Sequence, residues 1–538
     1  MNKDNSFRQS NKFLDESLES IPRLLGQLDR NRGTLTYGSF DRNHWLAKTA
    51  DISNARNQEA IYTLSLIYAR NFEGNVYYKN KKILEWIIAS LKFTKSIQKH
   101  DGSFDEYYQN ESSFVCTSFV TIALAQTYFL MKESGDLSEK QKKIFLNILE
   151  ESSQWLSYNL DDEVSNQLAG SAFALSLTSK ILNKDKYQII AKNRLELLLT
   201  RQSNEGWWSE YGGPDIGYLS VTIDYLAKFR ILNNDQSFDD AIKKALNFLI
   251  NFIHPDYSVG GNYGSRNTEY LIPSGFSLLE NFKDAKMIIA VIEKGIKNKH
   301  GFSPTILDDR YLCNILYNWI EAGLSYAKGD DIDLWSRRID KSFEESSIRV
   351  FQNSQLYFVS NLRKGGSFSL FTRDGNYSDS GLLIQTNKKN YTTGNLTNDS
   401  QNINKLTANG TAAIIKTHTM SGLKALIFKT WQFMFGKIPF IQKITRKLLR
   451  KLLITESKKT AIKFNRSFKL KNNELFIKDT VEGVLSDGKI TINRKGSYNA
   501  VVSSKYFSIN DILLNELVPI ESYKAEMKTK QITRLFKL

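Results

Sequence analysis

The spacing of the apolar residues changes once along the chain, near residue 350, and this change constrains the fold more than any other feature. Before it, apolar residues recur every three or four positions, as in residues 58–69, which is the spacing of amphipathic α-helices. After it, runs such as residues 354–362 alternate apolar and polar residues between Gly, Asn and Asp, as antiparallel strands do. We therefore predict an all-α domain at residues 1–345 and a β-sandwich at residues 346–538.

The length of the chain agrees with this division. With 538 residues, of which 41% are hydrophobic, the sequence can build more than one packed core. Residues 330–350 carry many charges between a few apolar positions, and we predict that they form a helix that links the two domains.

Three loops of the first domain share one composition. Residues 100–113, 204–218 and 257–270 each combine glycines, aromatic residues and carboxylates, and each leads into the next predicted helix. Stacked helical hairpins produce this pattern when their connections gather on one side. If the hairpins close into a ring, an α/α toroid, the loops surround one cavity; an open solenoid is the alternative. We expect the functional site in these loops, because binding and catalytic residues concentrate in loops that a rigid scaffold holds.

One basic segment interrupts the strand pattern. Residues 422–455 alternate Lys and Arg with Trp, Phe and Leu and contain no acidic residue. We predict a basic amphipathic helix that lies on an anionic membrane surface. The alternative is a helical excursion that covers the sheet and turns its cationic face to solvent. The formal net charge of +16 favours a polyanionic partner, although a Lys-rich compositional bias accounts for it equally well.

Several classes of site lack their sequence motifs. The chain has no CxxC, HExxH or P-loop motif and no dinucleotide-binding fingerprint, so we expect no metal and no cofactor. Cys116 and Cys313 lie in apolar helical runs and are expected to be buried free thiols. The first residues show no apolar signal segment, and no run of 18 apolar residues occurs, so we expect a cytoplasmic protein.

Polar and aromatic side chains in the predicted loops are the candidate site residues. They are Arg42, His44, Arg56, Asn166, Trp207, Trp208, Glu210, Tyr211, Asp215, Tyr218, Tyr263, Arg266 and Asn267. Some have structural alternatives: Asn166 caps a helix, Trp207 and Trp208 pack a hairpin, and Arg266 pairs with Glu269 three residues on.

Together, these features resemble the heparinase II/III-like proteins, relatives of alginate and heparin lyases. The resemblance rests on the helical N-terminal region, the string SNQLAGSAFAL at residues 165–175, the Gly-Trp…Glu-Tyr…Tyr loop and the β-rich C-terminal region. In that family a helix opens with Asn followed by His, and Asn166-Gln167 matches it with Gln in place of His. The family's catalytic tyrosine follows a Glu on a Gly-rich loop, and Tyr218 is its best match, with Tyr211 as second choice. The resemblance implies an α/α toroid, a β-sandwich and β-elimination on uronate polymers.

That chemistry requires the residue types found here. The proton at C5 of a uronate becomes acidic when donors neutralise the adjacent carboxylate, and Asn166, Arg56 and Arg266 are expected to do so. Tyr218 and His44 are the expected base and acid, with Tyr263 in reserve. A tyrosine base needs its pKa lowered from near 10, which adjacent arginines favour. The side chains expected to bind substrate are Arg42, Arg56, Trp207, Trp208, Glu210, Asp215, Tyr263 and Asn267.

The residues leave other activities open. A C5-epimerase abstracts the same proton, and an inverting glycoside hydrolase would use two of Glu106, Glu111, Glu210 and Asp215 at a separation of about 6.5–9.5 Å. A non-catalytic polysaccharide-binding protein at the membrane surface is the third alternative. Without an export signal, we expect a role beside the machinery that assembles surface polysaccharide, at the inner membrane face. The expected partners are acidic polysaccharide or lipid-linked oligosaccharide, and no nucleic acid.

Overall fold

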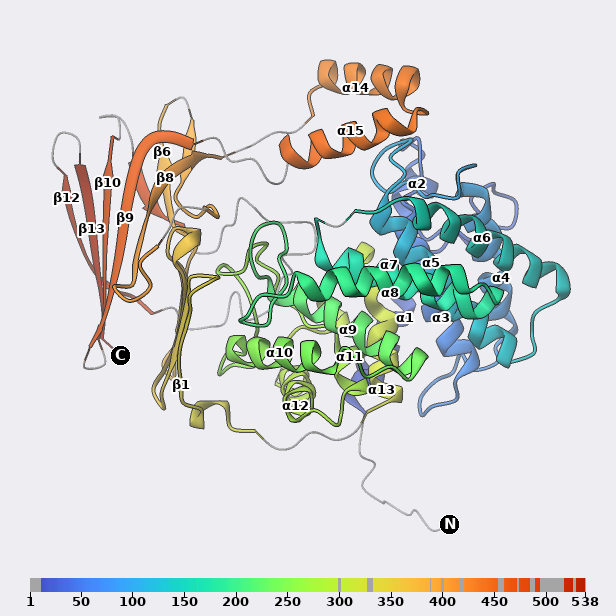
Figure 1. Cartoon of the computed structure of the whole chain (residues 1–538), viewed down its shortest axis with the longest axis horizontal. Helices are drawn as coiled ribbons and strands as arrows, with labels where there is room; N and C mark the ends of the chain where they lie inside the picture. The colour runs from blue at the N-terminus through green and yellow to red at the C-terminus, as the bar shows by residue number, and fades with distance from the viewer. Residues whose placement is uncertain are drawn as a thin grey trace, which may run out of the picture.

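Helices fill the first part of the chain and strands fill most of the second (Figure 1). The structure is a computed structural model, and it describes residues 11–161, 163–298, 301–326, 332–387, 389–397, 401–415, 420–452, 459–471, 474–483, 489–493, 517–525 and 529–537. The helices of the first part are α1 (Lys12–Gln27), α2 (Arg42–Ala47), α3 (Ala60–Ala69), α4 (Lys81–Ile97), α5 (Phe114–Glu133), α6 (Glu139–Tyr158), α7 (Ser165–Leu182), α8 (Asp185–Thr200), α9 (Ile216–Asn233), α10 (Asp239–Leu249), α11 (Pro273–Leu278), α12 (Lys283–Lys297) and α13 (Asp309–Leu324). Short 3-10 helices occur at η1 (Ala55–Glu59), η2 (Ile250–Phe252) and η3 (Pro304–Ile306).

The inner helices of this part close a ring. Going round it, α3 packs on α5, then α7, α9, α11 and α13 follow, and α13 returns to α3. An outer helix, α1, α4, α6, α8, α10 or α12, packs behind each inner one. The domain is therefore an α/α toroid, as expected, and the open solenoid is excluded. The closed ring positions the connections at one end of the inner helices around a common space.

Helix α5 belongs to the centre of this packing. Among the described residues it is the one helix long and apolar enough to cross a membrane, with a mean hydropathy of 1.6, but 83% of its apolar window is buried inside the molecule. It contacts α3, α6 and α7, and its Cys116 is a buried free thiol, as is Cys313 on α13. A helix covered on all sides needs no polar face, so its apolar composition reflects burial in the toroid.

The second part of the chain forms two antiparallel sheets. The first runs in sequence order through β1 (Ile339–Phe343), β2 (Ile348–Gln352), β3 (Leu356–Asn361), β4 (Ser367–Thr372) and β5 (Asn376–Asp379). The second has the order β11-β6-β7-β8-β9-β10-β13-β12. Its strands are β6 (Leu382–Gln385), β7 (Asn390–Thr392), β8 (Thr407–Ile414), β9 (Lys459–Lys471), β10 (Glu474–Glu482), β11 (Lys489–Ile492), β12 (Ile520–Ala525) and β13 (Thr529–Lys537).

The first sheet is covered on both faces. Along β3, Leu356 and Phe358 join a core shared with β9, β10 and β13, whereas Tyr357 and Val359 join the core of the toroid. Successive side chains of a strand point to opposite faces, so this alternation places the first sheet between the toroid and the second sheet. The C-terminal part is thus the expected β-sandwich, packed on the toroid through one of its sheets.

The prediction of a linking helix at residues 330–350 is wrong. In the described part of residues 330–350 there is no linking helix; the 3-10 turn η4 (Leu334–Ser336) leads directly into β1 and β2. Ile339, Ile348 and Val350 are buried in the toroid core, and this packing outweighs the charge pattern that suggested a helix. The predicted boundary at 345/346 accordingly falls after β1.

The basic segment forms two helices where one was predicted, α14 (Gly422–Phe435) and α15 (Pro439–Arg450). Gly436 and Pro439 separate them, and Pro439 opens α15 because its fixed φ suits the first helical position. The resulting hairpin lies over the toroid (Figure 1). The alternative prediction had placed a helix on the sheet instead.

Candidate functional site

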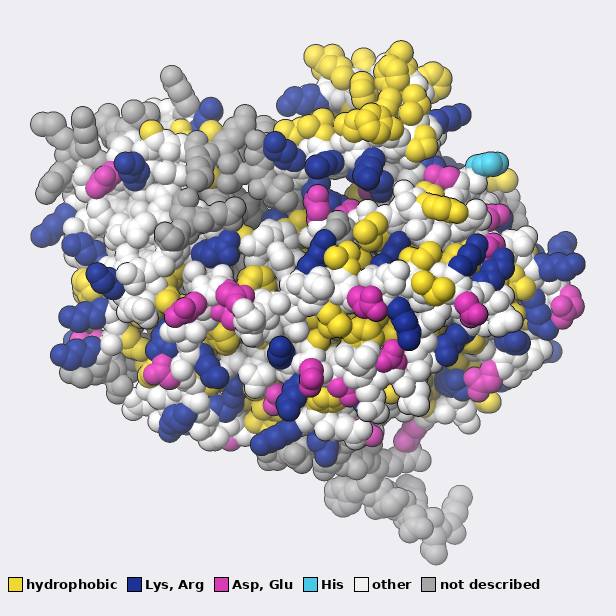
Figure 2. Space-filling view, viewed as in Figure 1, with side chains coloured by type: hydrophobic (Ala, Val, Ile, Leu, Met, Phe, Trp, Pro, Cys, Tyr) yellow, Lys and Arg dark blue, Asp and Glu magenta, His cyan; other side chains and the backbone are white. Residues whose placement is uncertain are grey.

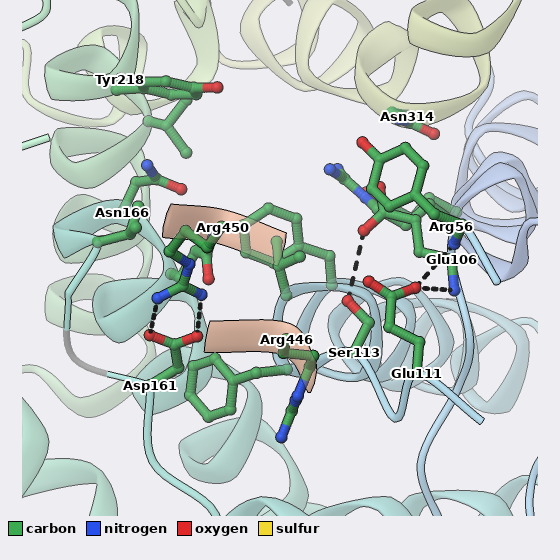
Figure 3. Close-up of a pocket in the computed structure, with 18 of the residues that line it drawn as sticks. Arg56, Glu106, Glu111, Ser113, Asp161, Asn166, Tyr218, Asn314, Arg446 and Arg450 are labelled. Carbon is green, nitrogen blue, oxygen red and sulfur yellow. Dashed lines mark hydrogen bonds and ion pairs between the residues drawn. The ribbon is translucent and has the colours of Figure 1, made fainter. Parts of the chain in front are cut away.

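A cavity of about 650 Å³ opens inside the toroid at the loop end of the ring. All three Gly-aromatic loops contribute to it: residues 100–113 provide Glu106, Tyr107, Tyr108, Glu111 and Ser113, residues 204–218 provide Tyr211 and Tyr218, and residues 257–270 provide Tyr270. Figure 3 shows two facing walls, with Asn166 and Tyr218 on one and Arg56, Glu106 and Glu111 on the other. The convergence of distant connections on one space, which the sequence predicted, is present.

Asn166 is held in place by a buried carboxyl group. It is the second residue of α7; its backbone N–H donates to Glu210 Oε1 (2.9 Å) and its Nδ2 donates to Glu210 Oε2 (3.0 Å). The N-cap position of α7 is Val164, so Asn166 does not cap this helix. Burial raises the pKa of Glu210 to about 8, against the smaller lowering effect of the two donors from Asn166. Glu210 thus positions Asn166 from behind the cavity wall.

Tyr218 extends into the cavity from the first turn of α9 (Figure 3). Asp215 is the N-cap of that helix and accepts hydrogen bonds from the backbone N–H groups of Tyr218 (3.3 Å) and Arg266 (2.9 Å). The Tyr218 ring lies edge-on to Tyr270, with centroids 6.5 Å apart. Asp215 is therefore a structural residue that fixes the start of α9, and its carboxylate does not line the cavity.

The opposite wall carries a cluster of opposite charges. Arg56 Nε donates to Glu59 Oε1 (2.7 Å), and its guanidinium lies 4.8 Å from the centre of the Phe119 ring. Arg310 Nη2 donates to Glu106 Oε1 (2.5 Å). Glu111 Oε2 accepts the backbone N–H groups of Glu106 (2.9 Å) and Tyr107 (2.7 Å). Arg310 itself does not line the cavity, so an anionic ligand there would meet Arg56 on this wall, beside the carboxyl groups of Glu59 and Glu106.

The protonation of those carboxyl groups decides the charge of the wall. Burial raises the pKa of Glu59 to about 7, although Arg56 lowers it in part. Burial and the neighbouring Glu106 raise the pKa of Glu111 to about 8, against the hydrogen bonds that it accepts from the backbone. Near neutral pH these groups are partly or mostly uncharged, so the wall is less negative than its composition indicates.

Replacing Glu111 with Gln tests this protonation. In the unfolded chain this carboxyl titrates near 4.5 and in the folded protein near 8, so its contribution to stability is complete below 4.5 and is lost as the pH rises through 8. Gln keeps the acceptor for both backbone N–H groups but cannot titrate. We expect a smaller fall in the free energy of unfolding between pH 5 and pH 9 for Glu111→Gln than for the unaltered protein, measured by urea unfolding. Equal slopes would contradict a raised pKa.

Most other tyrosines of the cavity are poor proton acceptors. Burial raises the pKa of Tyr107, Tyr108, Tyr225 and Tyr317, and raises the pKa of Tyr211 to about 12. Their hydroxyl groups stay protonated near neutral pH.

The hairpin of α14 and α15 forms the roof of the cavity. Phe428, Gln432, Arg446 and Arg450 line the space from above. Arg450 Nη1 donates to Asp161 Oδ1 (3.0 Å) and to Glu163 Oε2 (2.8 Å), and Figure 3 shows the first of these pairs beside Asn166. Arg446 Nη1 donates to the carbonyl oxygen of Ser112 (2.6 Å). The cavity therefore takes its arginines from an insertion in the β-sandwich as well as from the toroid.

Arg42 and His44 do not reach the cavity. Both lie on the short helix α2, and Arg42 lines a separate hollow of about 310 Å³ with Asp309 and Arg310. Lys48, at the C-terminal end of α2, adopts a left-handed conformation (φ 56°), which ends the helix after six residues. The cavity therefore does not support the prediction of His44 as the catalytic acid.

Trp207 and Trp208 are packing residues. Both are buried in the toroid core, where Trp208 Nε1 donates to the Leu198 carbonyl (2.9 Å) and Trp207 Nε1 donates to Glu205 (2.8 Å). A ring without an exposed face cannot stack on a sugar, so the prediction that they bind substrate is wrong. The alternative interpretation, packing of the hairpin between α8 and α10, is the one that their burial supports.

Most of the third Gly-aromatic loop lies at the contact between toroid and sandwich, and its last residue, Tyr270, lines the cavity. Tyr263 is fully buried and hydrogen-bonded to His254 Nε2 (2.8 Å), and its carbonyl accepts from Asn361 Nδ2 (2.7 Å). Asn267 Oδ1 accepts from Lys364, whose pKa burial lowers to about 7. Tyr263 and Asn267 are therefore not substrate ligands, because the strands of the sandwich cover this loop.

Arg266 lies one layer behind the cavity. Its guanidinium stands 4.5 Å from the centre of the ring of Tyr211, which does line the space. Burial lowers the pKa of Arg266. A direct contact between Arg266 and a ligand, as the sequence predicted, is not supported by this position, whereas Arg56 is at the surface of the cavity.

Sequence reasoning missed part of the site. Tyr311 and Asn314 on α13 line the cavity, as do Arg446 and Arg450 on α15. Asn314 and Asn318 stand four residues apart in the apolar middle of α13, which places both on one face, and the sequence shows this spacing. Nothing in the sequence indicated that the hairpin folds back over the toroid.

Of the carboxylates considered for hydrolysis, Glu210 and Asp215 do not line the cavity. Glu106 and Glu111 do, but both belong to one loop on one wall, and Glu111 accepts the backbone N–H of Glu106. An acid and a base on opposite sides of a sugar need carboxylates on facing walls. The geometry therefore does not favour an inverting hydrolase that uses two of these four carboxylates. Within the described residues, no group of three or more His, Cys, Asp or Glu side chains is arranged to hold a metal ion.

Comparisons with known proteins find a family model and solved structures that are similar to this chain. Residues 44–271 match the model of the ulvan lyase N-terminal domain. The chain is similar to the chondroitin AC lyase of Streptomyces coelicolor in complex with chondroitin sulphate, with 10% identity, a TM-score of 0.58, and coverage of 100% of this chain and 78% of that chain. It is also similar to heparinase III, with 11% identity, a TM-score of 0.48, and coverage of 99% and 90%. At 10% identity the likeness to the chondroitin lyase concerns the fold. No curated protein sequence matches the chain.

Proposed function

We propose that this chain, which resembles the heparinase-like polysaccharide lyases, is itself a lyase that cleaves an acidic, uronate-containing polysaccharide by β-elimination. The comparisons support a polysaccharide lyase, and the uronate specificity is our inference from the site. The observation that carries it is the pairing of Asn166, fixed by Glu210, with Tyr218 on one wall of a cavity roofed by arginines.

In this mechanism Asn166 binds the carboxyl group of the uronate. Its amide is held by Glu210, so that it needs no reorganisation when negative charge develops on that carboxyl group during removal of the C5 proton. Arg56, at the cavity surface, and Arg450, in the roof, supply positive charge on either side. Donors that are already oriented stabilise the enolate-like intermediate more than they stabilise the substrate.

Tyr218 acts as the base and then as the acid. His44 lies outside the cavity, whereas Tyr218 extends into it from the wall that carries Asn166, so Tyr218 is the best placed proton acceptor. As the phenolate, it takes the C5 proton, the electron pair of that C–H bond forms the C4–C5 double bond, and the C4–O bond breaks with its electron pair on the departing oxygen. The same hydroxyl returns the proton to the departing oxygen. One residue serves both steps only when the C5–H and C4–O bonds lie on one face of the sugar, so we expect uronates with that configuration to be the substrates.

A panel of uronate polymers tests the reaction class. The protein is incubated with each polymer, and the absorbance of a new C4–C5 double bond is followed together with reducing ends. A lyase raises both signals. Reducing ends without the double bond would indicate a hydrolase, exchange of deuterium at C5 without cleavage would indicate an epimerase, and binding alone would indicate the non-catalytic alternative; each of these results would overturn the proposal.

The place of this reaction in the cell is part of the same proposal. The positively charged chain fits a polyanionic substrate in surface-polysaccharide metabolism, including chains still linked to lipid. We propose a cytoplasmic location at the inner face of the membrane, which fractionation of cells that express the tagged protein would test.

A further inference from the structure

The α14–α15 hairpin has two faces of different chemistry, and only one of them is used by the fold. Its inner face contributes Phe428, Arg446 and Arg450 to the cavity roof and is fixed to the toroid by ion pairs of Lys429 with Asp51 and of Arg450 with Asp161. The inner face explains how the hairpin is held over the cavity. It does not explain the composition of the outer face.

The outer face exposes large apolar side chains. Phe433 is 86% exposed, Phe440 72% and Leu423 70%, and the remaining members of this apolar face are Leu426, Ile427, Trp431, Met434, Ile438, Ile444, Leu448 and Leu452. Figure 2 shows these hydrophobic side chains gathered over the hairpin at the top of the molecule. Single exposed apolar residues are common on soluble proteins, but a continuous group of this kind marks a surface that binds something.

Lysines accompany this apolar face. Lys424, Lys437, Lys443, Lys447 and Lys451 are exposed on the two helices or directly beside them, and residues 420–452 contain no Asp or Glu. Long lysine side chains can extend from an apolar face to reach charged head groups. A helix with one apolar side, lysines beside it and no acidic residue is the type that lies in the interface of an anionic bilayer.

This charge distribution favours a bilayer over a protein partner. Protein interfaces are depleted in lysine at their centre. A second copy of this chain would bring the same lysines opposite one another across a twofold axis, where equal charges repel. The helices have 14 and 12 residues, which is too short to span a bilayer that requires about 20, so the hairpin would lie in the plane of the membrane surface.

We infer that the outer face of the α14–α15 hairpin docks on an anionic lipid bilayer and thereby holds the roof of the cavity against the membrane. The same two helices carry the apolar face outside and the cavity roof inside, so docking places the cavity about one helix diameter, roughly 10 Å, from the lipid head groups. The consequence for the substrate rests on the proposed function: the cavity is positioned for an acidic polysaccharide held at the bilayer.

Vesicle co-sedimentation with the full-length protein tests the docking. The vesicles contain phosphatidylglycerol mixed with phosphatidylcholine, or phosphatidylcholine alone. We expect binding to the anionic vesicles that weakens as salt is added. The double variant Phe433→Glu, Phe440→Glu should bind at least about tenfold more weakly, because two apolar rings no longer enter the interface. Both positions are highly exposed, so the variant should keep the thermal unfolding temperature of the unaltered protein.

The matched control places the same charges elsewhere. Ile189 on α8 and Ile231 on α9 are 60% and 53% exposed, and the double variant Ile189→Glu, Ile231→Glu should bind vesicles as the unaltered protein does. Absence of binding to anionic vesicles, or equal loss in both double variants, would overturn the inference. Self-association that Phe433→Glu, Phe440→Glu abolishes, measured by sedimentation equilibrium, would also overturn it in favour of a second copy.

The lyase assay on soluble polymer separates this inference from the proposed function. The Phe433→Glu, Phe440→Glu variant should cleave soluble polymer at the rate of the unaltered protein while losing vesicle binding. Vesicle binding without cleavage of any polymer would contradict the proposed lyase and leave docking supported, whereas cleavage without vesicle binding would do the reverse.

Discussion

Tyr218→Phe is expected to lower kcat/KM on the cleaved uronate polymer by about 10²–10⁴-fold, the range that general acid–base groups contribute. Phenylalanine keeps the ring and its edge-on contact with Tyr270 but removes the hydroxyl that transfers the proton in both steps. Because the ring remains, the free energy of unfolding should change little. The measurement is the initial rate of double-bond formation as a function of polymer concentration, with unfolding in urea as the check on folding.

His44→Ala is the matched control for this prediction. The sequence made His44 a candidate acid, but its helix α2 lies outside the cavity, so its removal should change kcat/KM less than about twofold. A large loss in His44→Ala, or near-normal activity in Tyr218→Phe, would reverse the assignment of the two residues.

Arg534→Met is expected to destabilise the β-sandwich by about 3–5 kcal/mol, the cost of leaving a buried charge without its partner. Arg466 and Arg534 alternate with Asp379 and Asp479 in a closed set of ion pairs: Arg534 contacts Asp379 at 2.5 Å and Asp479 at 2.6 Å, and Arg466 contacts them at 3.0 and 2.5 Å. All of these side chains are at most 2% exposed. Methionine fills most of the volume, so the expected loss reflects uncompensated carboxylates rather than a cavity.

These ion pairs also determine how the free energy of unfolding changes with pH on the acid side of neutrality. Burial alone would raise the pKa of Asp379, but the two arginines outweigh it and hold that pKa below its usual range. The stabilisation is therefore present above the unfolded pKa and is lost as the pH falls through the folded one. Arg70→Met, which breaks an exposed pair with Glu133, is the control and should cost less than about 1 kcal/mol. Equal losses in the two variants would contradict a special role for the buried set.

The sequence predicted the architecture because two different periods of apolar residues were visible in it. The three-to-four spacing before residue 350 corresponds to helices that bury one or more sides, and the alternation after it corresponds to strands such as β3 and β4. The resemblance to heparinase-like lyases, taken from the SNQLAGSAFAL string and the β-rich second half, is confirmed. The prediction of the linking helix was wrong because this segment packs against the toroid as strands β1 and β2. No local sequence pattern indicates that packing.

The site was predictable in part. Asn166, Arg56 and Tyr218 were named from sequence and line one cavity, because they precede or begin the inner helices whose ends meet there. Tyr263 and Asn267 failed because their loop has the same composition but is covered by the sandwich, and composition does not distinguish a loop that binds a ligand from one that binds another domain. The prediction that Trp207 and Trp208 bind substrate was wrong because both side chains are buried in the toroid core. The sequence does not show which loop residues the packing of the helices buries.

The hairpin roof was beyond sequence reasoning for a different reason. The pattern of residues 422–455 predicts amphipathic helices. It does not predict the surface on which they pack, because that depends on pairs such as Arg450 with Asp161, which are separated by almost three hundred residues in the chain. Pairs of residues so far apart produce no periodic pattern in the sequence.

The chemical nature of the new chain ends tests the central claim most directly. Mass spectrometry of fragments made from a defined uronate oligosaccharide distinguishes elimination, which leaves a non-reducing end lighter by one water, from hydrolysis, which leaves a saturated end. We predict only the unsaturated ends, formed by the unaltered protein and lost in Tyr218→Phe and Asn166→Ala. Saturated ends, or unsaturated ends that persist in both variants, would contradict the account.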